Sequence, residues 1–138
     1  MLESAIATAA KAHEGQTDKA GKPYILHPLR VMLNVKGGIP EQCAAVLHDV
    51  IEDTDITAEA LLELGFSKEV VDAVVLLTRS KDEDYMEYVK RLKANTIARA
   101  VKLADLADNM DMSRIPNPTE KDFARLEKYK KAKSLLLG

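Results

Sequence analysis

Residues 46–53 read Val46-Leu47-His48-Asp49-Val50-Ile51-Glu52-Asp53 and set four ionisable side chains among apolar neighbours on nearly every side of an expected helix. Such a helix is expected to be central and buried. Burying a histidine and three carboxylates is costly unless these groups are paired or bound to a cation. A bound metal ion is the simplest explanation for this segment.

Outward from this segment, apolar residues recur at intervals of three and four, and β-branched residues do not alternate with polar ones. The chain is therefore predicted to be all-α, with about seven or eight helices. In the first half of the chain, helices are expected over residues 3–13, from His27-Pro28 to Gly37, and over 41–53. Thr57 is expected to cap a short helix that Gly65 ends, and Ser67 to cap the next one. The remaining helices are expected over 85–92, from Asn95 to about Met112, and from Thr119 to Leu137.

Charge and composition limit the class of protein. The 138 residues contain 20 Lys and Arg against 22 Asp and Glu, a net charge of −2 that gives no electrostatic basis for nucleic acid as the main partner. A hydrophobic share of 46% is enough for one core, so a single domain over residues 1–138 is expected. No apolar run approaches a membrane span, and the single cysteine, Cys43, suits a reducing compartment. We expect a cytoplasmic protein with no membrane partner, and the oligomeric state stays open.

The donor types indicate which metal could be bound. Adjacent residues on a helix point about 100° apart, so His48 and Asp49 can reach one ion only above their shared edge. Two candidates from other helices complete the set, His27 before Pro28 and Asp105 in a second apolar helix interrupted by charge. Two imidazoles and two carboxylates without a thiolate suit Mn²⁺, Fe²⁺ or Zn²⁺. Taken alone, a His-Asp pair is more often a cap or a local hydrogen bond.

Four separated blocks of the sequence resemble one known family. They are His13-Glu14-Gly15-Gln16, Lys19-Ala20-Gly21-Lys22-Pro23-Tyr24-Ile25-Leu26-His27-Pro28, Leu47-His48-Asp49-Val50-Ile51-Glu52-Asp53-Thr54 and Lys102-Leu103-Ala104-Asp105-Leu106-Ala107-Asp108-Asn109-Met110. In this order and spacing they look like the HD hydrolase domain of the Rel/SpoT alarmone enzymes, especially the small stand-alone hydrolases. The resemblance covers nearly the whole chain.

The resemblance implies a single-domain HD-type helical bundle with Mn²⁺-dependent hydrolase activity. The reaction would remove the 3′-pyrophosphate from ppGpp or pppGpp, nucleotides of the stringent response, and release GDP or GTP and pyrophosphate. Glu52 and Asp53 match the acidic pair of that family, which positions and activates the attacking water. The positions that match its metal ligands are His27, His48, Asp49 and Asp105.

Five further residues are candidates for substrate contact. Lys19 lies in a glycine-containing loop and would face phosphates, with a solvated loop lysine as the alternative. Tyr24 is expected to orient that loop and to pack near the site. Asn109 lies one helical turn after the acidic ligand of its helix, with a surface amide as the alternative. Arg125 and Tyr129 repeat this spacing on the last helix and resemble a nucleotide-contacting pair, with an exposed basic helix as the alternative.

One position departs from the family pattern. Asp18 stands where the family usually has the first member of a basic pair, which often contacts guanine. A carboxylate there would repel phosphate and could not offer guanine a cationic stacking surface. The preference for guanine is therefore open. Two alternatives therefore accompany the alarmone hydrolase: a hydrolase acting on another phosphorylated nucleotide such as NADPH, and a nucleotide-sensing module without turnover. The intact Glu52-Asp53 pair argues against the sensing module.

Overall fold

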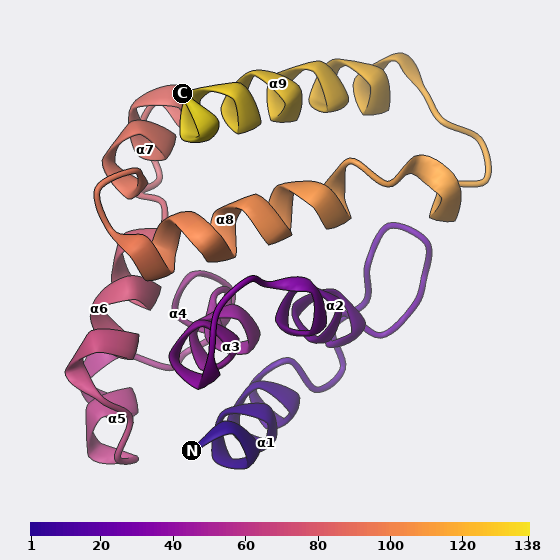
Figure 1. Ribbon diagram of the computed structural model, residues 1–138. Helices are drawn as coiled ribbons and strands as arrows, with labels where there is room; N and C mark the ends of the chain where they lie inside the picture. The colour runs from indigo at the N-terminus through magenta and orange to yellow at the C-terminus, as the bar shows by residue number, and fades with distance from the viewer.

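The computed structural model describes residues 1–138 and confirms the all-α prediction. Figure 1 shows helices throughout the chain and no strand. The bounds are α1 Leu2–Ala12, α2 Leu26–Asn34, α3 Ile39–Leu47, α4 Val50–Asp53, α5 Ala58–Glu63, α6 Lys68–Leu77, α7 Tyr85–Leu92, α8 Thr96–Asn109, the 3-10 helix η1 Met112–Arg114, and α9 Glu120–Leu137.

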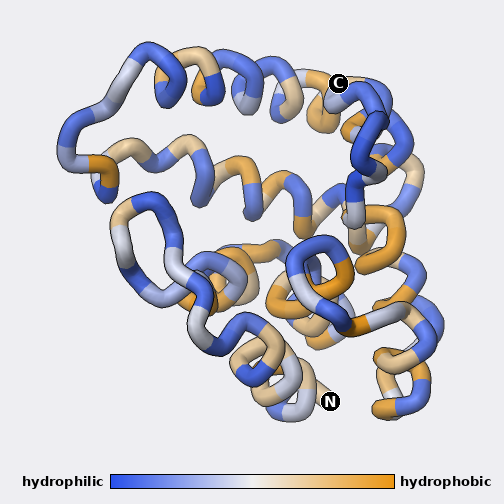
Figure 2. Tube along the Cα trace, turned by 180° about the vertical axis from the view of Figure 1, so that it is seen from behind, coloured by the Kyte–Doolittle hydropathy of each residue, from blue (hydrophilic) through white to orange (hydrophobic).

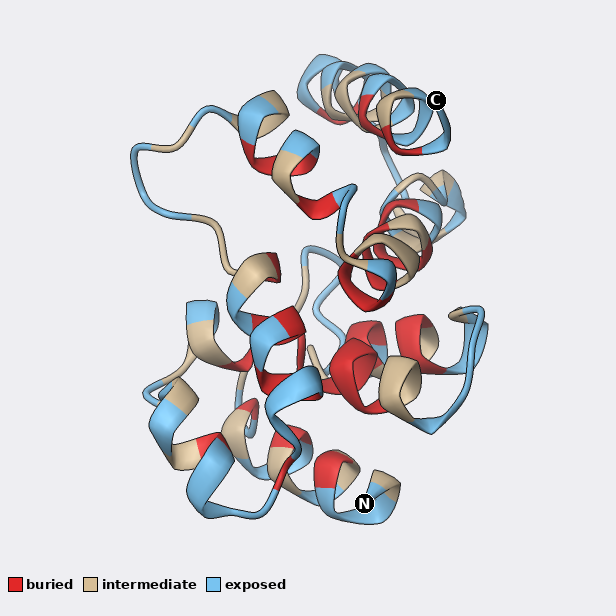
Figure 3. Cartoon of the chain, turned by 60° about the vertical axis from the view of Figure 1, so that its left-hand side comes forward, coloured by how far each residue is buried: buried red, intermediate tan, exposed pale blue.

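The central helix of the fold is α3, as the sequence predicts, but the prediction that Glu52 and Asp53 are buried is wrong, because α4 leaves both carboxylates exposed. It contacts α1, α2, α6 and α8, and its residues 43–47 are fully buried. These residues belong to one core of 27 buried hydrophobic side chains. Figure 3 shows this core as the inward faces of the helices. Cys43 lies within it as a small buried side chain.

Four predicted helix starts are confirmed by their caps. Each capping side chain accepts a backbone N–H that the first helical turn leaves unpaired. At α9, Asp122 of the predicted capping box accepts the backbone N–H of Thr119 at 2.8 Å and the Thr119 hydroxyl at 3.1 Å. The other three acceptor and donor pairs are Thr57 with Ala60, Ser67 with Val70, and Asn95 with Ala98.

The predicted continuous helix over residues 41–53 is wrong. Two residues, His48 and Asp49, interrupt it and separate α3 from α4. The carbonyl of Ala45 accepts the His48 N–H at 3.3 Å and the His48 ring Nδ1–H at 2.6 Å. A side chain that donates to a helical carbonyl in this way competes with the backbone hydrogen bonds of the helix. The interruption raises the number of α-helices to nine, above the seven or eight expected.

Two helices end earlier than predicted. Although the sequence suggests that α8 continues to about Met112, it ends at Asn109. The carbonyl of Asp108 accepts a hydrogen bond from the Arg114 guanidinium at 3.1 Å, and Asp111 caps η1. These contacts satisfy the end of α8 without a further turn. Similarly, α2 ends at Asn34, whose side chain donates to the carbonyl of Arg30.

The last two long helices, α8 and α9, run antiparallel and pack against each other (Figure 1). Hydrophilic residues cover much of α9, as Figure 2 shows, while Ala132 and Leu136 are fully buried. No helix in the chain combines the length and the apolar character that crossing a bilayer would need.

A substitution at Leu47 tests whether α3 lies at the centre of the core. Its side chain is fully buried, so Leu47→Ala is expected to lower the free energy of unfolding by about 2–5 kcal/mol because a cavity remains. Leu33→Ala is the matched control, since Leu33 is 73% exposed and should change the same quantity by less than about 0.5 kcal/mol. Urea unfolding monitored by circular dichroism measures both. Equal effects would contradict the assignment of α3 to the core.

Candidate metal centre and nucleotide pocket

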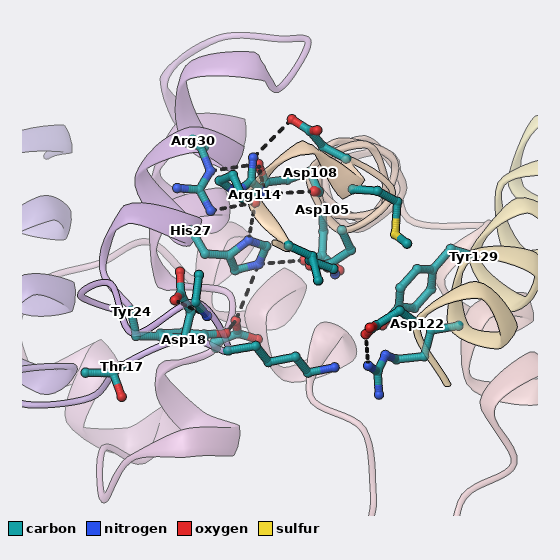
Figure 4. A pocket seen from close by; sticks show the side chains of 18 of the residues that line it. Thr17, Asp18, Tyr24, His27, Arg30, Asp105, Asp108, Arg114, Asp122 and Tyr129 are labelled. Atoms are coloured by element: carbon teal, nitrogen blue, oxygen red, sulfur yellow. Dashed lines mark hydrogen bonds and ion pairs between the residues drawn. The ribbon is translucent and has the colours of Figure 1, made fainter. Parts of the chain in front are cut away.

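One pocket gathers most of the predicted functional residues. It has a volume of about 470 Å³ and is lined by 21 residues, only five of them hydrophobic. Its walls come from the loop before α2, from α2, α4 and α8, from the segment after α8, and from α9. Figure 4 shows the ionisable side chains of these elements pointing toward one another.

Three of the four predicted metal ligands, His27, Asp49 and Asp105, line this pocket, and the fourth, His48, is buried beside them. Nε2 of His27 lies 2.9 Å from Oδ1 of Asp105 and 3.9 Å from Oδ2 of Asp49. Nε2 of His48 lies 3.1 Å from the same Asp49 oxygen and 3.3 Å from the same Asp105 oxygen. Adjacent donors on one ion, each about 2.1 Å from it, are separated by about 3 Å. Donor atoms of His27, His48 and Asp105 all lie within 4.8 Å of one another, which suits one coordination shell, while Asp49 approaches the two histidines from the side.

The interruption at His48 and Asp49 brings these neighbouring side chains together. Because Nδ1 of His48 donates to the Ala45 carbonyl, Nε2 is the ring nitrogen that faces the two carboxylates. This nitrogen is buried and has no hydrogen-bond partner in the protein. A buried ring nitrogen that lies 3.1 and 3.3 Å from two carboxylate oxygens without forming a hydrogen bond to either fits a cation bound at that point. The residues present therefore fit a divalent metal ion.

His27 is held by carboxylates on both sides of its ring. Nε2 contacts Asp105, while Nδ1 donates to Oδ2 of Asp108 at 2.6 Å. Burial disfavours the charged ring, but the hydrogen bonds to Asp105 and Asp108 outweigh it and raise the pKa of His27. For His48, burial is likewise outweighed, chiefly by the charge of Asp49, and the pKa of His48 is raised well above its ordinary value.

The two acidic donors are ionised in this environment. Burial alone would raise the pKa of Asp49, but the adjacent His48 lowers it to about 2. The pKa of Asp105 is also held well below its ordinary value, because buried Lys102 and the two rings outweigh its burial. The Nζ of Lys102 lies 2.9 Å from Oδ2 of Asp105. Asp105 thus carries its charge between a lysine on one side and the donor cluster on the other.

Tyr24 orients Asp49. Its hydroxyl donates to Oδ2 of Asp49 at 2.5 Å, and burial followed by the Asp49 charge strongly raises the pKa of Tyr24. The Tyr24 ring stands between two histidine rings, with centroids 5.1 Å from His13 and 5.7 Å from His27. His13 in turn bonds Oε1 of Gln16 through Nδ1 at 2.8 Å. These contacts place the first sequence block directly behind the donor cluster.

The acidic pair lies on α4, on the pocket wall beside the donors. Oε1 of Glu52 accepts the backbone N–H of Arg79 at 2.8 Å. Partial burial and the negative charges of Asp49 and Glu52 raise the pKa of Asp53 to about 6. The carbonyl of Asp53 accepts a hydrogen bond from the Gln16 amide at 3.0 Å.

All five residues expected to contact substrate line the same pocket. Asn109 donates to Oδ1 of Asp105 at 3.3 Å, so it lies beside the donor cluster. Partial burial and the charge of Arg125 lower the pKa of Lys19, which indicates that these two cations face a common space. Arg125 is paired with Asp122 at 2.5 Å, and the Tyr129 ring lies 6.5 Å from that of Tyr85. Tyr24 is engaged with Asp49, as described above.

Sequence reasoning missed three residues around the donors, namely Arg30, Lys102 and Asp108. Arg30 and Asp108 form a two-point ion pair, at 2.8 Å from Nε to Oδ1 and 3.1 Å from Nη2 to Oδ2. A pattern in the sequence could have revealed Asp108, because it follows Asp105 by three residues and therefore shares its helical face. Lys102 precedes Asp105 by the same interval.

Asp18 has a structural role in its loop. Its Oδ1 accepts the backbone N–H groups of Ala20 and Lys22, both at 2.9 Å. This carboxylate therefore closes the loop that carries Lys19, in the manner of Asx turns. Asp18 also lines the pocket, so its negative charge remains on the wall.

Paired histidines and aspartates at the centre of a helical bundle define a class of metal-binding proteins, the HD domain. The family described as HD domain matches residues 5–126 of this chain. This match spans most of the sequence and includes all four donors, and the chain belongs to the HD domain family.

Two relatives within this family have names that state an activity. The chain is 36% identical over 122 residues to guanosine-3′,5′-bis(diphosphate) 3′-pyrophosphohydrolase of Vibrio cholerae, and 35% identical over 123 residues to the bifunctional (p)ppGpp synthase/hydrolase SpoT of Escherichia coli K12. Each alignment covers 79% of this chain, which spans only 17% of the length of either relative.

A solved structure is similar over almost the whole fold. It is that of a metazoan ortholog of SpoT, described as hydrolysing ppGpp and as having a role in starvation responses. The TM-score is 0.83 at 25% sequence identity, with 99% of this chain and 85% of the other covered.

Proposed function

We propose that this protein is a metal-dependent hydrolase that removes the 3′-pyrophosphate from ppGpp and pppGpp and releases GDP or GTP and pyrophosphate. One observation carries the proposal: donor atoms of His27, His48 and Asp105 lie within 4.8 Å of one another, with Asp49 3.1 Å from His48, beside a pocket that holds an acidic pair and cationic side chains. The similarity to named pyrophosphohydrolases over most of the chain supports the choice of substrate.

The residues that would hold the ion are His27, His48, Asp49 and Asp105. We propose Mn²⁺ as that ion, since the donors are nitrogen and oxygen without thiolate. When bound, a divalent ion supplies positive charge against phosphoryl oxygens and lowers the pKa of a coordinated water. Tyr24 would fix the orientation of the Asp49 carboxylate, and Lys102 would keep Asp105 ionised.

The acidic pair would manage the proton of the attacking water. Water adds to the phosphorus that is linked to the 3′-oxygen and its proton passes to a carboxylate of Glu52 or Asp53. The bond from this phosphorus to the 3′-oxygen breaks, and the 3′-oxygen takes up a proton to become the ribose hydroxyl. Asp53, with its pKa near 6, can both accept and release a proton close to neutral pH. Lys19 and Arg125 would bind phosphate oxygens, Asn109 would hold the ribose or a phosphate, and Tyr129 would offer a stacking face to the nucleotide.

A nucleotide panel tests the proposed function. Purified protein loaded with Mn²⁺ is incubated with ppGpp, pppGpp, NADPH, GTP and ATP, with and without a chelator, and the products are identified by chromatography. We expect GDP and pyrophosphate from ppGpp, and loss of turnover with the chelator. Intact ppGpp in a sample that holds Mn²⁺ would overturn the proposed substrate.

The second candidate is hydrolysis of another phosphorylated nucleotide such as NADPH. The observation that favours it is Asp18, whose carboxylate on the pocket wall cannot provide a cationic surface for guanine. Turnover of NADPH alone in the panel would support this candidate. Binding without turnover of any nucleotide would support a nucleotide-sensing module instead. A cytoplasmic location remains a prediction from the single buried cysteine, Cys43.

A further inference from the structure

A chain of ion pairs extends from the donor cluster through His27 to the surface. Nδ1 of His27 donates to Oδ2 of Asp108 at 2.6 Å, and Arg30 contacts both oxygens of that carboxylate, at 2.8 and 3.1 Å. Arg114 adds a third cationic contact, 3.3 Å from Oδ1 of Asp108. Figure 4 shows His27, Arg30, Arg114 and Asp108 on one side of the pocket.

The helices place these groups in two facing pairs. His27 and Arg30 are three residues apart on α2, while Asp105 and Asp108 are three residues apart on α8, so each pair lies on one helical face. Because α2 packs against α8, Asp105 meets one nitrogen of the His27 ring and Asp108 meets the other. The ring is thereby fixed in both position and rotation.

We infer that Asp108, held by Arg30 and Arg114, is a positioning residue that presents Nε2 of His27 to the metal centre. The inference rests on the metal centre of the proposed function. An ionised carboxylate can accept hydrogen bonds but cannot donate one, so its partner Nδ1 keeps its proton and Nε2 is left free to bind the metal. A negatively charged partner at Nδ1 also makes Nε2 more basic, which strengthens a metal bond.

The surroundings of Asp108 fit this role. Its side chain is only 8% exposed and that of His27 only 9%. Arg30 at 2.8 and 3.1 Å and Arg114 at 3.3 Å surround this buried carboxylate with positive charge. Arg30 binds through two points, which fixes the plane of the carboxylate as well as its charge. Arg30 thus acts on His27 through Asp108.

The histidine content of the chain makes a direct test possible. Only three histidines are present, so protein labelled with ¹⁵N at histidine gives six ring nitrogens to assign. With Zn²⁺ as a diamagnetic probe, we expect the wild-type His27 ring to be protonated at Nδ1 and bound through Nε2. Zn²⁺ affinity is measured in parallel by competition with a chromogenic chelator. Neither measurement uses a nucleotide.

Three variants separate positioning from packing. Asp108→Ala is expected to weaken Zn²⁺ binding by about 10–100-fold and to perturb the His27 ring signals, as loss of an outer partner does at other metal sites. Asp108→Asn, which keeps the shape and one acceptor oxygen, should have a smaller effect in the same direction and is available if the alanine variant does not fold. Arg30→Met, which leaves Arg114 in place, should weaken binding least.

Glu83→Gln is the matched control. Glu83 is held by the Arg91 fork at 2.7 and 2.9 Å, so this variant also removes one carboxylate from an arginine pair, at a site outside the pocket. It should leave both Zn²⁺ affinity and the His27 signals unchanged. Wild-type affinity and unchanged His27 signals in both Asp108 variants would overturn the inference. A wild-type protein that binds Zn²⁺ as expected but leaves ppGpp intact would overturn the proposed substrate alone.

Discussion

Asp49→Ala is expected to eliminate metal uptake and turnover together. Oδ2 of Asp49 lies 3.1 Å from Nε2 of His48 and also accepts the Tyr24 hydroxyl, so the change removes one of two acidic donors and leaves that hydroxyl without its acceptor. Mn²⁺ affinity should fall by more than about a hundredfold, the upper range for loss of an outer partner. A bound divalent ion would supply several kcal/mol of stabilisation to the proposed reaction, so the rate should fall by at least about a thousandfold.

Two measurements check this result. Metal content after dialysis against Mn²⁺ reports uptake, and the initial rate of pyrophosphate release reports turnover. Asp55→Ala is the control, because Asp55 is an exposed carboxylate that lies outside the pocket of the donors. It should retain both properties. An Asp49→Ala protein with full Mn²⁺ content and wild-type rate would remove Asp49 from the metal centre.

Glu52→Ala is expected to separate the two properties. Glu52 lies on the pocket wall but is not one of the residues that could hold the metal ion. Mn²⁺ affinity should therefore stay within about twofold of the wild-type value. Loss of a positioned base typically lowers the rate by about 10²–10⁴-fold, and we expect kcat to fall within that range while KM changes little. Mn²⁺ titration and steady-state kinetics on the same sample measure the separation.

A second variant distinguishes proton transfer from support of the Arg79 backbone. Glu52→Gln keeps an oxygen that can accept the Arg79 N–H but cannot serve as a base. It should therefore be as slow as Glu52→Ala. Recovery of the wild-type rate in Glu52→Gln would assign Glu52 a structural part and leave Asp53 as the base. Glu59→Ala, at an exposed carboxylate on α5, should retain the wild-type rate.

Local chemistry explains which features could be predicted from the sequence. Helix starts at Thr57, Ser67 and Asn95 follow from side chains that pair with the next turn, so a few neighbouring residues determine them. The central position of α3 follows from the apolar residues that occupy nearly every side of this helix in the sequence. Convergence of His27, His48, Asp49 and Asp105 was also expected, and the structure brings these side chains together. Their roles as ligands remain a prediction.

The features that escaped prediction depend on contacts between distant segments or on one unusual side-chain bond. The spacing of apolar residues does not indicate that the His48 ring donates a hydrogen bond to the Ala45 carbonyl, or that the helix is interrupted there. Arg30 and Asp108 are 78 positions apart, and only the packing of α2 on α8 makes them partners. Asp18 was expected to disturb phosphate binding, whereas its loop hydrogen bonds became visible only in three dimensions.

The shortness of α4 has a consequence for how the rate could be adjusted. A helix of four residues has no stability of its own in water, so Glu52 and Asp53 owe their placement to neighbours. Those neighbours are the Gln16 amide, the Arg79 backbone and the Thr54 hydroxyl, which bonds the Val50 carbonyl. None of the three belongs to the ion-holding set. Variation at these tethers is therefore expected to change the rate of the proposed hydrolysis and to leave the affinity for the proposed metal ion unchanged.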